Sequence, residues 1–145
     1  TAHPTGVSLI TVHGDGPDEI WAVGRDQIIH VSVTGSGICV DDQTPDIGGY
    51  DINGVFALNR KKLWAVADGS VAWRTLDGGK AWKKRSPEGA GYLFRVWALD
   101  KKHAWVTTGD YTGHGSIQYT SDGGKHWTAQ EIPANPQMWG ISFVK

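Results

Sequence analysis

The sequence predicts an all-β protein built from small four-stranded sheets that repeat along the chain. Two observations carry this prediction. The 145 residues include 20 Gly and 8 Trp but a single Met, a mixture that favours short strands and tight turns over long helices. A pattern also recurs roughly every 41 to 45 residues, which is the length of four short strands with their turns. Helical periodicity is absent and no linker divides the chain, so we expect one domain, residues 1–145.

The clearest copies of the repeat share an eight-residue motif. Residues 75–82 and 120–127 both read Thr-x-Asp-Gly-Gly-Lys-x-Trp, and they stand 45 residues apart. Upstream of the motif, two apolar segments recur 41 residues later, namely 55–58 and 63–66 as 96–99 and 104–107. The difference of four residues predicts an insertion in the later copy, where residues 109–114 form a longer loop.

An earlier copy keeps the framework but has lost the motif. Residues 20–24 stand 43 residues before 63–67, and the same offset sets Cys39 where the later copy has Trp82. Cys39 is the only cysteine, so no disulfide within the chain can form, and we expect it to be a small buried apolar residue. At the other end, residues 139–144 resemble residues 54–58, which predicts the first strand of a further copy.

Units of this length and strand number are typical of β-propeller blades. In the second copy the four antiparallel strands are expected near 53–58, 63–67, 70–75 and 81–85. The predicted units are blade 1 at about 6–46, blade 2 at about 47–91, blade 3 at about 92–138 and the first strand of a further blade at 139–145. Three blades cannot close a ring. We therefore expect either part of a larger propeller or a homo-oligomer that completes one.

The repeated motif suits a hairpin turn between the third and fourth strands of a blade. Its carboxylate can accept backbone N–H groups across the turn, its glycines supply positive φ, and its indole can cover the turn. A Ca²⁺ ion needs more oxygen ligands than such a turn offers. We therefore predict a structural role for the ten motif residues: Thr75, Asp77, Gly78, Gly79, Trp82, Thr120, Asp122, Gly123, Gly124 and Trp127.

These residues carry a resemblance. The order Lys-x-Leu-Trp-Ala-Val at 61–66 followed by the Thr-x-Asp-Gly-Gly-Lys-x-Trp motif resembles the BNR or Asp-box propellers. It is most similar to the photosystem II stability and assembly factor-like group. The match spans residues 7–144, with the full motif in the second and third copies. The resemblance implies a non-enzymatic binding or assembly scaffold with a protein partner, often periplasmic, luminal or secreted. Asp-boxes also occur in sialidases and sortilin-type receptors, so the motif defines fold better than function.

Charge and motif content exclude several functions. The chain carries 14 Lys and Arg against 15 Asp and Glu, a net charge of −1, which does not favour nucleic-acid binding. No apolar run is long enough for membrane insertion. The six histidines are scattered without metal-ligand spacing and are expected on the surface or in turns. We predict no metal, no cofactor and no catalytic residues, since the arginine cluster and carboxylate pair of a glycosidase are not recognisable.

One candidate binding surface is basic. The turns between first and second strands are basic in the second and third copies and acidic in the first, which has Asp15, Asp18 and Glu19. Equivalent turns lie on one rim of a propeller, so this rim could dock an acidic partner. The residues are Arg60, Lys61, Lys62, Lys101 and Lys102.

The second candidate surface lies on the opposite rim. The inserted loop carries Tyr111 and His114, while Tyr92 and Trp139 begin neighbouring blades. Aromatic rings beside polar donors suit sugar or peptide recognition. The functional expectation is therefore a protein-binding scaffold first, a carbohydrate-binding lectin-like module second and a sialidase-like glycoside hydrolase third.

Overall fold

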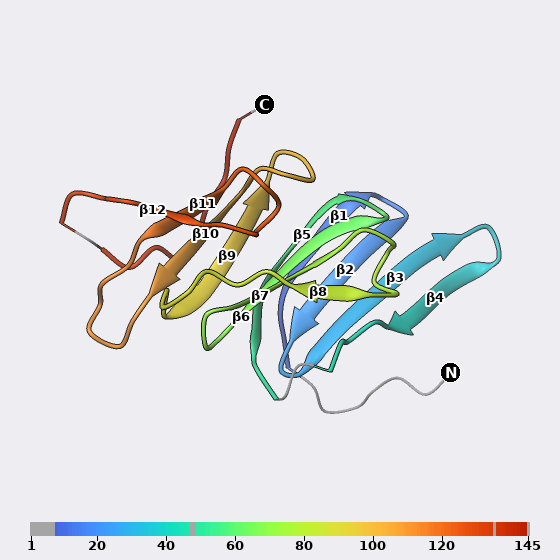
Figure 1. Ribbon diagram of the computed structural model, residues 1–145. Coiled ribbons are helices and arrows are strands. Elements are labelled where there is room, and N and C mark those ends of the chain that lie inside the picture. The colour runs from blue at the N-terminus through green and yellow to red at the C-terminus, as the bar shows by residue number, and fades with distance from the viewer. Residues whose placement is uncertain (1–7, 47–48, 135, 145) are drawn as a thin grey trace.

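The computed structural model describes residues 8–46, 49–134 and 136–144, which fold into three four-stranded antiparallel sheets, each with its strands in sequence order (Figure 1). Blade 1 contains β1 (Leu9–Gly16), β2 (Glu19–Gly24), β3 (Gln27–Thr34) and β4 (Gly37–Asp42). Blade 2 contains β5 (Ile52–Asn59), β6 (Lys62–Ala67), β7 (Val71–Thr75) and β8 (Trp82–Lys84). Blade 3 contains β9 (Tyr92–Ala98), β10 (Ala104–Gly109), β11 (Ile117–Thr120) and β12 (Thr128–Gln130).

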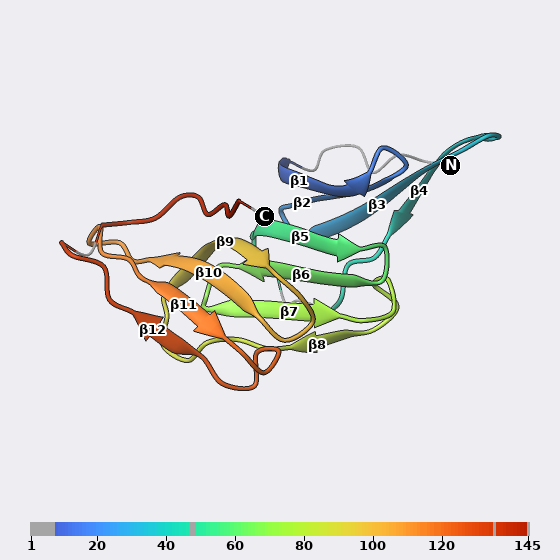
Figure 2. The same ribbon diagram turned by 90° about the horizontal axis from the view of Figure 1, so that it is seen from above.

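The first strands of the three sheets are neighbours. Strand β1 contacts β5, and β5 contacts β9, whereas the fourth strands β4, β8 and β12 lie apart from one another (Figure 2). This is the radial arrangement of propeller blades. The prediction of an all-β chain made of four-stranded antiparallel blades is confirmed.

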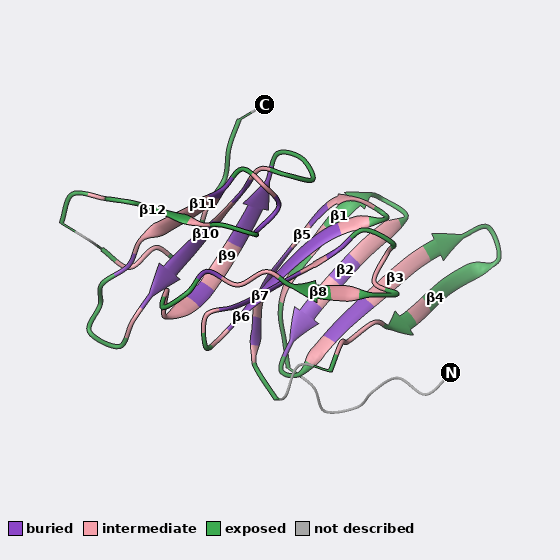
Figure 3. Ribbon diagram, in the orientation of Figure 1, coloured by how far each residue is buried: buried purple, intermediate pink, exposed green. Residues whose placement is uncertain are grey.

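The core lies between the sheets, because each sheet buries one face against the next. Trp21, Val23 and Ile28 of blade 1 pack against blade 2, and Trp64 and Val66 of blade 2 pack against blade 3. Strand β6 is buried on both faces, which explains its continuous apolar run at residues 63–67. Figure 3 shows the buried residues concentrated in the middle sheet, mainly on β6 and β7, whereas the outer strands β4, β8 and β12 are mostly exposed.

The other face of blade 1 is apolar and open. Its exposed side chains include Val12 on β1, Val33 on β3 and Ile38 on β4, which are 61%, 40% and 70% exposed. In blade 2, Val55 and Leu63 on the corresponding face are covered by blade 1 and are 6% and 0% exposed. Completion of the ring by further blades or by a second chain stays a prediction.

Three details differ from the sequence-based expectations. Residues 139–144 are in no strand here, because the described residues provide no second strand with which this segment could pair, and their place as the first strand of a further blade stays a prediction. Cys39 is exposed rather than buried, since it lies on the edge strand β4 where no other sheet packs. Cys39 pairs with Ser32, which lies opposite Glu19. Trp82 pairs with Thr75, which lies opposite Leu63, the residue 43 positions after Ile20, so Cys39 and Trp82 are not equivalent. The β2–β3 turn is one residue shorter than the β6–β7 turn, which shifts the alignment.

His13 on β1 joins blade 1 to blade 2. Its Nδ1 accepts a hydrogen bond of 3.0 Å from the Ala57 backbone N–H on β5, and its ring lies 4.3 Å from that of Phe56. An Nδ1 that accepts a hydrogen bond carries no proton. Burial lowers the pKa of His13 below its ordinary value, with Asp15 opposing the shift.

This contact predicts a pH-dependent stability. Because the pKa of His13 is lower in the folded chain, the unfolded chain binds more protons between the folded value and the unfolded value of about 6.5, and stability falls as the pH drops through that window. We expect a lower free energy of urea unfolding at about pH 5.5 than at about pH 7.5. His13→Asn, whose Oδ1 can accept the same bond, should lose less stability over this range. Equal pH dependence in both chains would contradict the assignment.

Candidate functional site

The two Asp-box turns follow β7 and β11 and share a pattern of hydrogen bonds. In the turn after β7, the Thr75 hydroxyl donates to Asp77 Oδ1 at 2.7 Å and accepts the Gly79 N–H at 3.0 Å. Asp77 Oδ1 also accepts the Ala81 N–H at 3.0 Å. The turn after β11 repeats this pattern with its equivalent residues: Thr120, Asp122, Gly124 and His126. Backbone donors, led by those of residues 81 and 126, lower the pKa of both carboxyls, so they stay ionised at neutral pH.

Each motif tryptophan bonds to the preceding blade. The Trp82 indole N–H donates to the Gln43 carbonyl at 3.0 Å, just after β4. The Trp127 indole N–H donates to the Arg85 carbonyl at 2.9 Å, just after β8. Both indoles therefore bridge adjacent blades beside the outer strand.

The motif also holds the basic turn of its own blade. The Gly78 N–H donates to the Lys61 carbonyl at 2.9 Å, and the Gly123 N–H donates to the Lys102 carbonyl at 2.8 Å. Gly123 has φ of 76°, and a Cβ there would meet Arg74 Nη1 at 1.8 Å and the Lys101 carbonyl at 3.0 Å. Glycine is required at this point because the two turns approach closely. Each Asp-box turn is thus hydrogen-bonded to the basic turn of the same blade.

Two equivalent side chains shape the basic turns. Asn59 Oδ1 accepts the backbone N–H groups of Lys61 and Lys62, each at 3.0 Å. Asp100 Oδ1 accepts those of Lys102 and His103, at 2.6 and 2.8 Å. The hydrogen bond from the His103 side chain, followed by these backbone bonds, lowers the pKa of Asp100 to about 2. In both turns the backbone is held by a side chain of the turn itself, and the lysine side chains project outwards.

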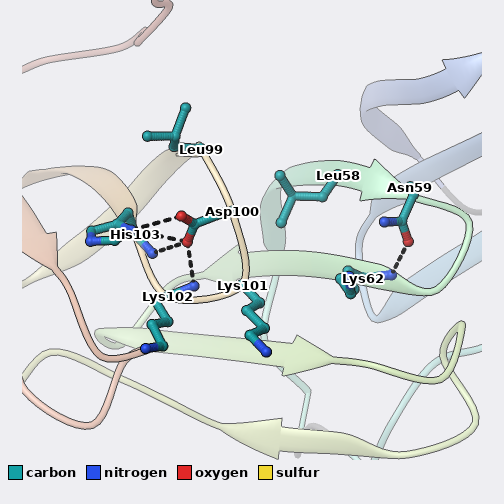
Figure 4. A pocket seen from close by; sticks show the side chains of 8 residues that line it. All are labelled: Leu58, Asn59, Lys62, Leu99, Asp100, Lys101, Lys102 and His103. Carbon is teal, nitrogen blue, oxygen red and sulfur yellow. Dashed lines mark hydrogen bonds and ion pairs between the residues drawn. The ribbon is translucent and has the colours of Figure 1, made fainter.

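A groove of about 660 Å³ runs between these two turns; its lining residues are Leu58, Asn59, Lys62, Leu99, Asp100, Lys101, Lys102 and His103. We call it the basic groove. Figure 4 shows Lys101 and Lys102 projecting from the same turn, with Asp100 held against His103. Leu99, which is 52% exposed, adds an apolar side chain to the groove lining, on the side of the turn away from the Lys101 and Lys102 ammonium groups (Figure 4). The groove can therefore contact both the carboxylates and the apolar atoms of a ligand.

The five predicted basic residues do not share one environment. Arg60 Nη2 lies 3.4 Å from Glu19 Oε1 of blade 1, so the acidic turn partly neutralises it. Lys61 lies on the turn but outside the groove lining. Lys62, Lys101 and Lys102 form no ion pair with any residue in the described ranges. These three lysines are the ones that an anionic ligand in the groove would meet.

The opposite rim holds a second, smaller groove of about 390 Å³, which we call the aromatic groove. Its lining residues are Tyr92, Phe94, Asp110, Tyr111, Gly113, Gln137 and Trp139. The structure thus brings together the predicted Tyr92, Tyr111 and Trp139. His114 lies on the same loop but lines a neighbouring depression with Gly89 and Ser116.

Several groove residues were not expected from the sequence. Asn59 and Asp100 occupy equivalent turn positions before the lysines, a signal for turn-capping side chains that the repeat contained. Phe94 and Gln137 had no comparable signal, because they reach the aromatic groove through the packing of β9 and of the segment after β12. Within the described residues, no three His, Cys, Asp or Glu side chains gather as metal ligands. The described part of the chain also contains no helix with the length and apolarity to span a membrane.

The radial sheets and repeated turns define the chain as three blades of a β-propeller. No protein-family model and no curated protein matches the sequence. Several solved structures are similar, and two of them are described here. A structure of YCF48 bound to a D1 peptide aligns with a TM-score of 0.71 and 24% identity, covering 87% of this chain and 42% of that chain. YCF48 from Cyanidioschyzon merolae aligns with a TM-score of 0.67 and 25% identity, covering 88% and 38%.

The likeness to YCF48 establishes the fold and agrees with the group that the repeat resembles. The chain spans about two fifths of the length of these two structures. The first of these YCF48 structures contains a bound D1 peptide.

Proposed function

We propose that this chain is a non-enzymatic assembly scaffold that binds an acidic segment of a partner protein in the basic groove. The observation that carries the proposal is the placement of Lys62, Lys101 and Lys102 around one groove, where none of them forms an ion pair with another described residue. An extended acidic segment could place carboxylates against these ammonium groups and apolar side chains against Leu58 and Leu99. The similarity to a propeller whose structure contains a bound peptide supports this choice over an enzyme.

The rigidity of the rim supports the same proposal. Side chains held by fixed turns lose less conformational entropy on binding than those on mobile loops. Both basic turns are capped by their own Asn59 or Asp100, and each is bonded to an Asp-box glycine. Arg74 adds a bond from its Nη1 to the Lys101 carbonyl at 2.8 Å. The groove is therefore largely formed before a partner arrives.

The proposal is tested with a labelled peptide of alternating Asp and Ala, and with an Asn-Ala peptide of the same length. We expect the acidic peptide to bind and the neutral one to bind at least about fivefold more weakly, with the difference shrinking as salt rises from about 0.05 to about 0.5 M. Lys101→Gln with Lys102→Gln should weaken acidic-peptide binding by about fivefold or more, since two charge contacts are lost.

The matched control changes the same charge elsewhere. Lys83 and Lys84 are exposed on β8 and lie outside the groove lining. Lys83→Gln with Lys84→Gln should leave the affinity within about twofold of the parent, because neither side chain lines the groove and salt screens the interaction of exposed charges that are not in contact. Equal losses in both double variants would show a diffuse charge effect and overturn the groove assignment.

A further inference from the structure

The aromatic groove combines four aromatic rings with one carboxylate. Its polar lining comes from Asp110 and Gln137, and no Lys or Arg is among the lining residues. Tyr111 is 89% exposed and Trp139 is 65% exposed, so these large rings have most of their surface open to a ligand. The groove is therefore opposite in charge to the basic groove on the other rim.

The two walls of the groove are each a pair of contacting rings. Phe94 and Trp139 stack with centroids 4.5 Å apart and planes inclined by 30°. Tyr92 and Tyr111 meet edge to face at 4.7 Å and 73°. Ring faces carry partial negative charge and attract cations that lie within about 6 Å of the centroid.

The walls come from distant parts of the chain, and hydrogen bonds hold them together. The Gln137 backbone N–H donates to the Gly113 carbonyl at 3.2 Å, and its side-chain amide donates to the Asp110 carbonyl. His114 and Pro136 form an isolated β-bridge beside them. The segment that carries Trp139 is thus fixed against the inserted loop that carries Tyr111.

The Asp110 carboxylate has one oxygen engaged by the loop. Oδ1 accepts the Thr112 N–H at 2.8 Å, the Thr112 hydroxyl at 2.7 Å and the His114 N–H at 3.0 Å. Among the described residues the other oxygen, Oδ2, has a long contact of 3.9 Å with His114 Nδ1. The hydrogen bond from the Thr112 hydroxyl, with those of the loop backbone, lowers the pKa of Asp110, so it is ionised at neutral pH.

We propose that the aromatic groove binds an arginine side chain of a partner protein segment, with the guanidinium over the rings and against Asp110. Arginine fits this lining better than lysine, because its planar group can stack on aromatic faces while its N–H groups donate to the remaining carboxylate oxygen, Asp110 Oδ2. The volume of about 390 Å³ lies within the range of about 300 to 1,000 Å³ that is usual for small-ligand sites. This site is separate from the basic groove and does not rest on the function proposed for that groove.

The experiment compares N-acetyl-arginine amide with N-acetyl-citrulline amide, which has nearly the same shape without the charge. Binding is followed through the indole N–H signal of Trp139 in NMR titrations. We expect arginine to shift this signal saturably and citrulline to bind at least about fivefold more weakly, the loss of roughly 1 kcal/mol of cation–π and ionic contact. Equal affinities for the two probes would overturn the proposal.

Variants locate the site and separate it from the basic groove. Asp110→Asn keeps an oxygen for the Thr112 and His114 N–H groups, and it should weaken arginine binding about fivefold or more, as should Tyr111→Ala. Asp41→Asn removes an exposed carboxylate from β4 and should have no effect, and the Lys101→Gln, Lys102→Gln chain should bind arginine as the parent does. An unchanged affinity in Asp110→Asn would overturn the proposal. Saturable shifts with cellotriose at lower concentrations than with arginine would instead support a sugar site and also overturn it.

Discussion

Replacing Trp64 with alanine is expected to lower the free energy of unfolding by about 3 to 5 kcal/mol, the usual range for a buried tryptophan. Trp64 is fully buried between blades 2 and 3. Its ring meets Trp127 edge to face at 5.9 Å, and the Arg74 guanidinium lies 5.6 Å from its centroid. Alanine would leave a cavity that two rigid sheets cannot close. Urea unfolding at neutral pH measures the loss.

The control for this variant is Trp64→Phe. Within the described residues no acceptor meets the Trp64 indole N–H, so phenylalanine removes no hydrogen bond and a smaller part of the packing. The phenylalanine variant should therefore lose well under half of what the alanine variant loses. Similar losses in the two variants would show that the position depends on something other than the volume that Trp64 fills between the blades.

Replacing Trp127 tests the bond between blades. Trp127→Phe removes the hydrogen bond to the Arg85 carbonyl and keeps an aromatic ring against Trp64, which should cost about 1 kcal/mol. Trp127→Ala also removes the ring, and we expect a total loss of about 2 to 3 kcal/mol because the side chain is half-buried. Both values come from the same urea titrations.

Trp139 serves as the control tryptophan, because it lies outside the contact between Trp64 and Trp127. It is 65% exposed, so Trp139→Ala should change the free energy of unfolding by less than about 1 kcal/mol. If Trp127→Phe were as stable as the parent, the indole bond would contribute nothing and the bridging role of the motif would be lost. In the double variant with Trp64→Ala, the two losses should not add, because the rings contact each other.

The strands of blade 2 could be predicted closely from the sequence. Strands expected near 53–58, 63–67, 70–75 and 81–85 are found as β5 to β8, with ends that differ by at most one residue. The prediction succeeded because the apolar run at 63–67 marks a strand buried on both sides, and the Asp-box positions the hairpin after it. Both signals act locally, so neighbouring sheets were not needed to interpret them.

Blade 1 was harder to predict because its outer hairpin lacks the motif. A single offset of 43 residues ignores the shorter β2–β3 turn, and this misplaced Cys39. The histidines show the same limit, since His13 and His30 were expected on the surface or in turns. His13 instead bonds across to β5, and His30 stacks on Trp21 with centroids 4.7 Å apart. Contacts between sheets leave no periodic signal in the sequence.

The candidate sites could be predicted only as surfaces. Equivalent turns indicated a basic rim, yet the ion pair of Arg60 with Glu19 depends on how blades 1 and 2 sit together. The partners of the motif tryptophans were also hidden, because they are backbone carbonyls of Gln43 and Arg85 rather than particular side chains. The repeat therefore predicts which residues are structural, and the packing of the blades determines which lysines remain available for a partner.

The central claim is that each Asp-box tryptophan joins its blade to the preceding one. Solvent exchange of the tryptophan indole N–H protons, measured by NMR, tests it most directly. The indole protons of Trp82 and Trp127 should exchange far more slowly than that of Trp139, because both are bonded to carbonyls of the neighbouring blade. Exchange of all three at the same rapid rate would contradict this mode of joining the blades.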